Sequence, residues 1–363
     1  MGYSRVLTLL TAAAFLFGPA PDRRIAAQQP RFKAVWEPVN YKGDVKLFDV
    51  HFADEETGWV VGGATELAGG VILFTKDAGR TWDVQYGDPQ SSDRAVSTVR
   101  FLDRTHGWAV QQTPLDTRLL RTTDGQNWDQ VGMIERHYTA LTFTSELNGT
   151  YLDSDTIYRT QDGGKKWEPV SPCKVQAEIN GLTKNTDCEF SAVHFPSAQI
   201  GYGAAGSVYL NDLFFVFKTT DGGLHWKPSN ISGSEGAAKD IVFTDPNVGY
   251  VRTGYPDSGR LYRTANGGES WTGVGASPGD TIKFVDPEVG WSFHYNKLSF
   301  TTNGGTRWTS RTFAFPTSTR AFSFPSRRRA YVIGDHGMIY RYSVVPIAYT
   351  AKGMIEAPLM PGQ

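Results

Sequence analysis

The sequence predicts an all-β fold, a seven-bladed β-propeller built from four-stranded blades. Three observations predict it: a turn phrase present six times, a phenylalanine register present seven times, and an incomplete last repeat that an N-terminal segment can complete. Repeats spaced by roughly 40–50 residues are typical of propellers and solenoids. Short alternating strands, four to a repeat, favour the propeller.

The turn phrase begins with Thr, has Asp or Asn two residues later, and ends with Trp. Asp and Asn at a turn accept hydrogen bonds from backbone N–H groups ahead of them, and the following Gly adopts a positive φ at little cost. Because Asn cannot serve as an acid or a base, we expect a structural role. One carboxylate per turn also falls short of the about 6–8 oxygens that calcium requires. The residues at this position are Asp77, Asp124, Asp162, Asp221, Asn266 and Asn303.

The second register is a Phe that ends an alternating strand. Six residues later comes a small residue, followed in all but one repeat by an aromatic one. The Phe positions are Phe52, Phe101, Phe143, Phe195, Phe243, Phe284 and Phe324. The pairs are Gly58-Trp59, Gly107-Trp108, Gly149-Thr150, Gly201-Tyr202, Gly249-Tyr250, Gly290-Trp291 and Ala330-Tyr331.

Each unit is predicted to hold four strands, and the first unit shows the pattern. LFDVHF is strand one, GWVVGG strand two, VILFTKD strand three, and TWDVQ strand four after the turn phrase. Alternation of period two, bounded by Gly, Asp, Asn and Pro, is the strand signal used here.

The seventh unit lacks its own fourth strand. No Asp-Gly turn and no Trp follow GMIYRYS, residues 337–343, whereas AVWEPV at 34–39 matches KWEPV at 166–170, the fourth strand of unit three. We therefore expect the segment around Trp36 to complete blade seven and close the ring, which pairs an otherwise open edge. The predicted organisation is a signal peptide at 1–27, a propeller at 32–343 and a C-terminal tail at 344–363.

The N-terminus resembles an export signal. Arg5 precedes the apolar run Val6–Phe17, and small residues at Ala26-Ala27 suit cleavage. The run is shorter than the ~20 residues of a spanning helix, and no Cys follows it to carry a lipid. A buried N-terminal helix is the alternative. Export predicts a periplasmic or extracellular protein.

The chain contains two cysteines, Cys173 and Cys188, in one predicted loop. In an exported protein an even pair predicts a disulfide, with two free thiols as the alternative. The formal net charge of −1 gives no reason to expect nucleic acid as a partner.

The turn phrase and its flanking strands resemble the Asp-box (bacterial neuraminidase) repeat families. Within that group, GWVVG ahead of ILFTKDAGRTW is similar to propellers of the photosystem II stability/assembly factor type. The resemblance implies an exported, non-enzymatic propeller that binds a partner protein during assembly. We expect a monomer with no cofactor, no metal and no catalytic residue.

A glycoside hydrolase, such as a sialidase, is the alternative function, because Asp boxes also occur in those enzymes. Sialidases have an N-terminal Arg-Ile-Pro, and the nearest match here, Arg24-Ile25-Ala26, lacks the Pro. Other Asp-box hydrolases use two carboxylates across a groove. Asp240 and Asp280, in adjacent predicted blades, are the best candidates for such a pair.

Candidate partner-binding residues lie where the repeats differ. The loops that join strands two and three share one face with the loops that join blades, and this face carries the long insertions. They span residues 64–70, 87–94, 171–189, 204–212 and 230–237. Binding residues favour such loops on a rigid scaffold, although tolerated surface insertions are the alternative.

Basic residues begin several inner strands on that face, and a ring of them would suit carboxylate-bearing peptides. They are Arg94, Arg136, Lys239 and Arg320, and Arg136-His137-Tyr138 is the richest cluster. On the opposite face Arg327, Arg328 and Arg329 form a second basic run, which the resemblance to assembly factors relates to an Arg-rich partner-binding patch. Solvated surface charge is the alternative in both places.

Overall fold

The computed structural model describes residues 32–64, 69–88, 94–170, 173–179, 181–206, 214–231, 238–254, 259–294, 296–347, 349–350 and 353–354. All regular elements in these ranges are β-strands, and they hold no helix long and apolar enough to cross a membrane. The predicted signal peptide lies outside them. The chain divides into two units, of which Ala34–Val344 is the propeller. In the other unit the described residues form β31 (Tyr349–Thr350) and β32 (Gly353–Met354).

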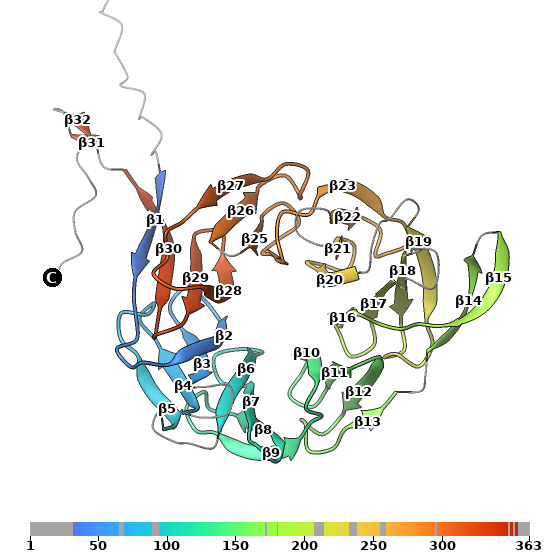
Figure 1. The fold of residues 1–363 in the computed structure, drawn as a ribbon, viewed down its shortest axis with the longest axis horizontal. Coiled ribbons are helices and arrows are strands. Elements are labelled where there is room, and N and C mark those ends of the chain that lie inside the picture. The colour runs from blue at the N-terminus through green and yellow to red at the C-terminus, as the bar shows by residue number, and fades with distance from the viewer. Residues whose placement is uncertain are drawn as a thin grey trace, which may run out of the picture. The chain divides into compact units, whose positions relative to one another are not determined.

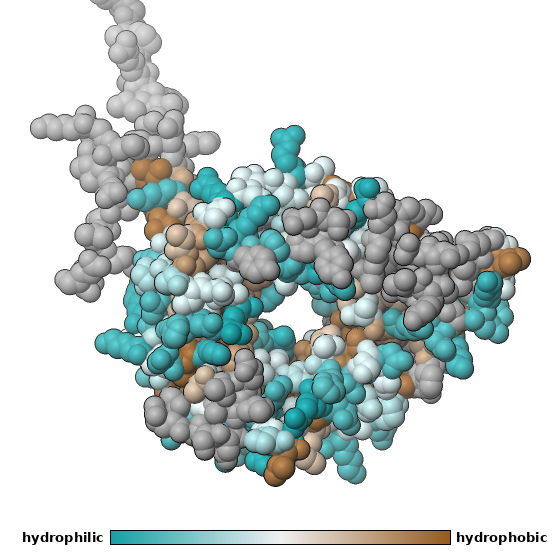
Figure 2. Space-filling model, in the orientation of Figure 1, coloured by the Kyte–Doolittle hydropathy of each residue, from teal (hydrophilic) through white to brown (hydrophobic). Residues whose placement is uncertain are grey.

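Seven antiparallel four-stranded sheets surround a central channel, as predicted (Figures 1 and 2). Blade one is β2 (Lys46–Phe52), β3 (Gly58–Gly63), β4 (Val71–Thr75) and β5 (Asp83–Gly87), and blade two is β6 (Ala95–Phe101), β7 (Gly107–Gln112), β8 (Thr117–Thr122) and β9 (Asp129–Met133). Blade three is β10 (Tyr138–Phe143), β11 (Gly149–Asp153), β12 (Thr156–Thr160) and β13 (Glu168–Pro169), and blade four is β16 (Ala192–His194), β17 (Gly201–Gly206), β18 (Phe214–Thr219) and β19 (Lys227–Ile231). Blade five is β20 (Ala238–Phe243), β21 (Gly249–Thr253), β22 (Arg260–Thr264) and β23 (Thr272–Ala276), and blade six is β24 (Thr281–Phe284), β25 (Gly290–His294), β26 (Lys297–Thr301) and β27 (Thr309–Thr312). Blade seven is β28 (Thr319–Ser326), β29 (Arg329–Gly334), β30 (Ile339–Pro346) and β1 (Phe32–Pro38).

An additional hairpin separates blades three and four. It consists of β14 (Lys174–Ile179) and β15 (Leu182–Asp187) and projects outward from the ring beside β19 (Figure 1). Cys173 and Cys188 form a disulfide at its base, as predicted, with the Cα atoms 5.4 Å apart. The bond closes a loop with a sequence separation of 15 residues, for which chain entropy gives about 3 kcal/mol of stabilisation.

The phenylalanine register marks the contact between neighbouring blades. In six interfaces the strand-two aromatic of one blade stacks on the Phe of the next, at centroid separations of 3.4 to 4.7 Å. In blades one to six the Trp of the Asp box meets the Phe of its own blade edge-on; these residues are Trp82, Trp128, Trp167, Trp226, Trp271 and Trp308. Such packing adds about 0.5–1.5 kcal/mol per ring pair beyond area burial.

The small residue six positions after each Phe makes room for that ring. A Cβ at Gly58, Gly201 or Gly249 would lie 2.3 to 2.6 Å from the Phe of its own blade. Blade seven has Ala330 at this position, and its Phe324 makes the widest of the stacks, 4.7 Å from Trp291. The spacing in the sequence is therefore a packing requirement.

The interface between blades three and four departs from this arrangement. Thr150 stands where the other blades have an aromatic residue, so no ring is available to stack on Phe195. Thr150 is 4 % exposed, and its hydroxyl is buried without a hydrogen-bond partner. Phe195 instead belongs to a core cluster with residues of the hairpin base, including Val175 and Cys188.

The N-terminal strand closes the ring, which confirms the prediction for Trp36. β1 is the outer strand of blade seven, and Trp36 packs against Phe313, Phe315 and Tyr342. Blade one holds the end of this strand through the indole N–H of Trp82, which donates to the Val39 carbonyl at 2.8 Å.

Arg341 connects three segments across the same seam. It donates to Glu37 of the closing strand at 2.6 and 2.9 Å and to the Ala78 carbonyl of blade one at 2.7 Å. The Arg341 side chain is 8 % exposed. Because the pairing of β1 with β30 spans nearly the whole sequence, the ring cannot close until both chain ends of the propeller are present.

We predict that Arg341→Met lowers the free energy of unfolding by about 1–3 kcal/mol, because it leaves the Ala78 carbonyl and the Glu37 carboxylate without their donor. Urea unfolding measures the change. Arg307→Met, at an exposed position on the turn of blade six, is the matched control and should change stability by less than about 0.5 kcal/mol. Equal effects of the two substitutions would contradict the closing role of Arg341.

We also predict that Thr150→Tyr stabilises the propeller by about 0.5–1.5 kcal/mol, since it supplies the ring that the other interfaces use. The counterpart Tyr250→Thr, which gives blade five the residue of blade three, should destabilise by about 2–4 kcal/mol. Thermal and urea unfolding of both variants provide the test. A loss of stability in Thr150→Tyr would show that this interface has no room for the ring.

Candidate partner-binding face

The propeller has two faces with different chemistry. The turns between strands one and two and the Asp boxes share one face, here called the turn face. The strand-two-to-three loops and the connections between blades share the other, here called the loop face, because the strands of each blade are antiparallel.

The Asp boxes are turn structures, as predicted. The box Thr hydroxyl donates to the Asp or Asn side chain, at 2.8 Å in Asp77 and 2.9 Å in Asn266. The same hydroxyl accepts the N–H of the Gly that follows, at 2.9 Å from Gly79 and 3.0 Å from Gly268. Asp and Asn boxes thus make the same contacts, and no charge is needed for them.

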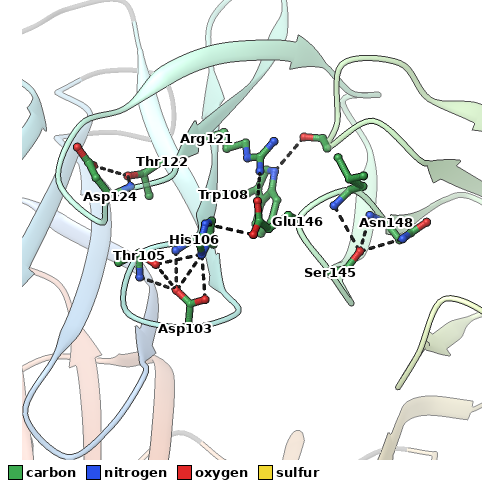
Figure 3. Close-up of polar contacts among 12 residues, drawn as sticks. Asp103, Thr105, His106, Trp108, Arg121, Thr122, Asp124, Ser145, Glu146 and Asn148 are labelled. Carbon is green, nitrogen blue, oxygen red and sulfur yellow. Dashed lines mark hydrogen bonds and ion pairs between the residues drawn. The ribbon is translucent and has the colours of Figure 1, made fainter.

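Neighbouring turns also contact one another across the blades (Figure 3). His106 and Arg121 of blade two lie 3.4 and 3.5 Å from the Glu146 carboxylate of blade three, and the Trp108 indole donates to the Gly163 carbonyl at 3.0 Å. The turn face is therefore a surface of contacts within the protein.

The second basic run, at Arg327, Arg328 and Arg329, belongs to this turn face, as predicted. Arg327 binds both carboxylate oxygens of Asp286 in blade six, at 2.6 and 2.7 Å. Arg329 donates to the Ser343 hydroxyl and lies 4.0 Å from Glu55 of blade one. Arg327 and Arg329 therefore connect blade seven to its neighbouring blades, and these contacts give both side chains a structural role that requires no partner protein.

On the loop face, the segment at the start of β10 carries the cluster Arg136, His137 and Tyr138. Arg136 is exposed and donates to the carbonyls of Thr113 and Pro114 at 3.2 and 2.9 Å. His137 is exposed next to it. Tyr138 turns inward instead, with its hydroxyl 2.9 Å from Ser97 and 2.6 Å from Thr98, and burial raises its pKa.

The remaining basic residues of the loop face differ in their surroundings. Lys239 is exposed and Arg94 is half-buried. Arg320 pairs with Asp335 at 2.5 and 3.4 Å and covers the ring of Phe48 at 5.5 Å. His336, in the turn after Asp335, lies 2.7 Å from Asp44. Of the candidate cations on this face, Arg136, Lys239 and Arg320 are exposed, and Arg320 is paired with Asp335.

Two carboxylates of the inner strands connect adjacent blades, a role that the sequence analysis missed. Asp49 accepts the N–H of Val50 at 2.9 Å and, across the interface, the N–H of Val99 at 3.1 Å, and it pairs with Arg100. Asp240 repeats this in blade five, where it accepts the N–H of Ile282 at 3.2 Å. Burial raises the pKa of Asp240.

A cation follows each of these bridges at the same register. Arg100 and Lys283 both directly precede the repeat Phe of the receiving blade. The Lys283 ammonium donates to the Phe322 carbonyl at 2.6 Å, and burial lowers its pKa. The sequence does contain a signal for the bridge. In one blade an Asp lies three residues before the repeat Phe, and in the following blade a cation lies one residue before its repeat Phe.

The candidate hydrolase carboxylates are engaged in different structures. The Asp240 carboxylate lies in the bridge between blades five and six, whereas Asp280 is exposed and lies 2.7 Å from the imidazole of His294. His51 and His194, in the position before the Phe, have their pKa lowered to about 4 by burial. Among the described residues no group of three or more His, Cys, Asp or Glu could hold a metal ion.

A family model described as photosynthesis system II assembly factor YCF48 matches residues 29–195. Photosystem II assembly lipoprotein Ycf48 of Synechococcus sp. (strain CC9902) is 28% identical over 166 residues, 44% of this chain and 46% of that protein. The match thus spans about half the length of this relative. The chloroplastic photosystem II stability/assembly factor HCF136 of Arabidopsis thaliana is 24% identical over 338 residues, 76% of this chain and 79% of that one. The chain is an Asp-box propeller whose sequence is similar to these assembly factors.

Solved structures show the same fold. A structure of YCF48 bound to a D1 peptide has a TM-score of 0.60 and 20% identity, covering 85% of this chain and 94% of that one. The GH74 enzyme of Niastella koreensis has a TM-score of 0.55 and 15% identity, covering 84% of this chain and 53% of that one. At such identities the likeness concerns the fold alone, and this fold also occurs in enzymes.

We predict that the Asp boxes make the propeller acid-sensitive. In Asp124 the N–H and side-chain amide of Asn127 and the N–H of Gln126 hold the pKa below its usual range. A carboxylate with a depressed folded-state pKa stabilises the fold above its unfolded pKa of about 4, and this contribution is lost as the pH falls below that value. Asp124→Asn should therefore narrow the difference in melting temperature between neutral and acidic pH. Asp129→Asn, at the exposed start of β9, is the control, and an unchanged difference in Asp124→Asn would contradict the prediction.

Proposed function

We propose that this chain is an exported, non-catalytic propeller that binds a protein partner through its loop face, in the manner of an assembly factor. The observation that carries the proposal is the match to assembly factors in both sequence and fold. One of the related solved structures holds a peptide of D1, and peptide binding by this chain is inferred by analogy with that protein.

The loop face supports the proposal because it combines a rigid frame with residues that differ between repeats. Arg136, His137 and Lys239 are exposed there, and Arg136 retains guanidinium donors beyond the bonds it makes to two carbonyls. A partner segment with carboxylate groups suits these cations. Arg94 and Arg320 lie at the same ends of inner strands and are proposed as secondary contacts.

Export is proposed from the N-terminal pattern at residues 1–27 and from the disulfide, which persists in oxidising compartments. The relatives named as a lipoprotein and as chloroplastic support a protein that acts outside the cytosol. We propose a periplasmic or extracellular monomer that acts without a cofactor.

The test is in-cell crosslinking followed by affinity purification and mass spectrometry of the full chain. We expect Arg136→Glu combined with Lys239→Glu to remove the specific crosslinked partner, because both charges on the loop face are reversed. Lys76→Glu combined with Arg307→Glu reverses two exposed charges on the turn face and should leave the partner bound.

Two results would overturn the proposal. A partner that is retained by the loop-face variant but lost by the turn-face variant would place binding on the opposite face. Turnover in a panel of oligosaccharides, abolished by Asp240→Asn in a variant that still melts cooperatively, would identify a glycoside hydrolase instead.

A further inference from the structure

The outer rim between blades three and four differs from the rest of the ring. The fourth strand of blade three, β13, has only 2 residues, whereas those of the other complete Asp-box blades have 4 or 5. It covers Tyr158 and Arg159 of β12, and one further bond joins the Val170 N–H to the Ile157 carbonyl at 2.8 Å. The chain then leaves the blade toward the hairpin.

A cavity of about 440 Å³ lies beside this shortened strand. Its apolar lining comes from three sources: Ile157 of blade three, Phe190 with the Cys173–Cys188 disulfide of the insertion, and Trp226 of blade four. Ile157 and Phe190 are each 4 % exposed overall. The same interface has Thr150 in place of the stacking ring, so blades three and four are held together less completely than their neighbours.

The rim of this cavity is acidic. Asp155, Asp187 and Glu189 line it and are exposed, and no Lys or Arg is among the lining residues. Lys174, at the base of the hairpin, lies 3.8 Å from Asp187 and is itself 75 % exposed. The charge of this site is therefore opposite to that of the basic residues on the loop face.

We propose that the cavity between blades three and four is a second docking site, which takes an apolar side chain of a protein segment flanked by Lys or Arg. A cavity of this size accommodates one or two large side chains. The apolar lining of the cavity would bury such a side chain. The three carboxylates at its rim would then lie beside the Lys or Arg residues that flank this side chain in the bound segment. Asp155, Asp187 and Glu189 together form the acidic rim of the cavity.

Charge complementarity selects this occupant over a neutral or acidic one. A segment with carboxylates would meet like charges at the rim, which disfavours association. A purely apolar segment would fill the floor but would add no positive charge beside the rim carboxylates. The acidic rim consists of other residues of the loop face than Arg136 and Lys239, so the two binding sites can be tested separately.

The experiment uses fluorescence anisotropy with the full mature chain and a labelled synthetic peptide that alternates Lys with Leu and Phe. Two matched peptides serve as comparisons, one with Glu in place of Lys and one with Ser in place of Leu and Phe. We expect saturable binding of the first peptide alone, weaker at about 0.5 M than at about 0.05 M salt because the rim charges are exposed.

Two variants locate the site. Neutralising the rim in Asp155→Asn, Asp187→Asn and Glu189→Gln should weaken binding of the Lys peptide roughly tenfold at low salt. Reversing two rim charges, in Asp155→Lys and Glu189→Lys, should exchange the preference in favour of the Glu peptide. The control is Glu56→Gln, Asp83→Asn and Asp129→Asn, which neutralises three exposed acids in blades one and two and should leave binding unchanged.

Unchanged melting temperatures in all three variants establish that the fold is intact, as expected for exposed positions. The proposal is overturned if the Lys peptide does not bind the unmodified chain, if the rim and control variants bind it equally, or if the Ser peptide binds as tightly as the Lys peptide. Loss of binding in Arg136→Glu, together with unchanged binding in the rim variants, would place the site at Arg136 instead.

Discussion

Contact between an aromatic ring of one blade and the repeat Phe of the next is the interaction on which this ring depends. In five blades the repeat Phe lies between the aromatic of the preceding blade and the Trp of its own Asp box, as Phe243 does between Tyr202 and Trp271. The Gly that faces the Phe follows from this packing, since a Cβ at Gly249 would lie 2.6 Å from that ring. One packing unit thus fixes three sequence positions, which is why the repeat can be recognised at low identity.

The ring also imposes a condition that no single blade can meet. The seventh sheet must pack against the first, and its closing contact joins residues as distant in the sequence as Glu37 and Arg341. Arg341 occupies the position directly before the place of the box Thr, where Arg121, Arg159, Lys218 and Arg263 lie in other blades. Arg159 reaches the Gly222 carbonyl of the next blade at 3.2 Å, as Arg341 reaches that of Ala78 at 2.7 Å. The interface that closes the ring therefore uses the same arginine-to-carbonyl contact as the interface between blades three and four, and Arg341 also binds Glu37 of the closing strand.

The sequence predicted this architecture well because the structural residues recur. The turn phrase, the Phe register and the match between residues 34–39 and 166–170 are all local patterns that report a repeated environment. The candidate site was less predictable for the opposite reason. Arg136, Arg320 and Arg327 are all exposed, but whether each is paired with a carboxylate depends on residues elsewhere in the fold, such as Asp335 for Arg320 and Asp286 for Arg327. Side-chain pairing between blades leaves no signal in a single repeat, and Asp240 was proposed as a hydrolase candidate for that reason.

Some positions that depart from the repeat have a structural explanation, and others do not. Ala330 and Asp49 depart from the pattern, and each is explained by packing or by a bridge between blades. Thr150 is different, because its hydroxyl is buried without a hydrogen-bond partner, and Phe195 packs against residues of the hairpin base in place of a ring from blade three. The disulfide, the hairpin and the shortened β13 all occur at that same interface. A ring that repeats one contact at six interfaces can relax it at the seventh, because closure holds the blades together elsewhere. The interface between blades three and four is therefore where this fold tolerates an opening, and an opening lined by aromatic and acidic groups is a feature that the scaffold itself does not require.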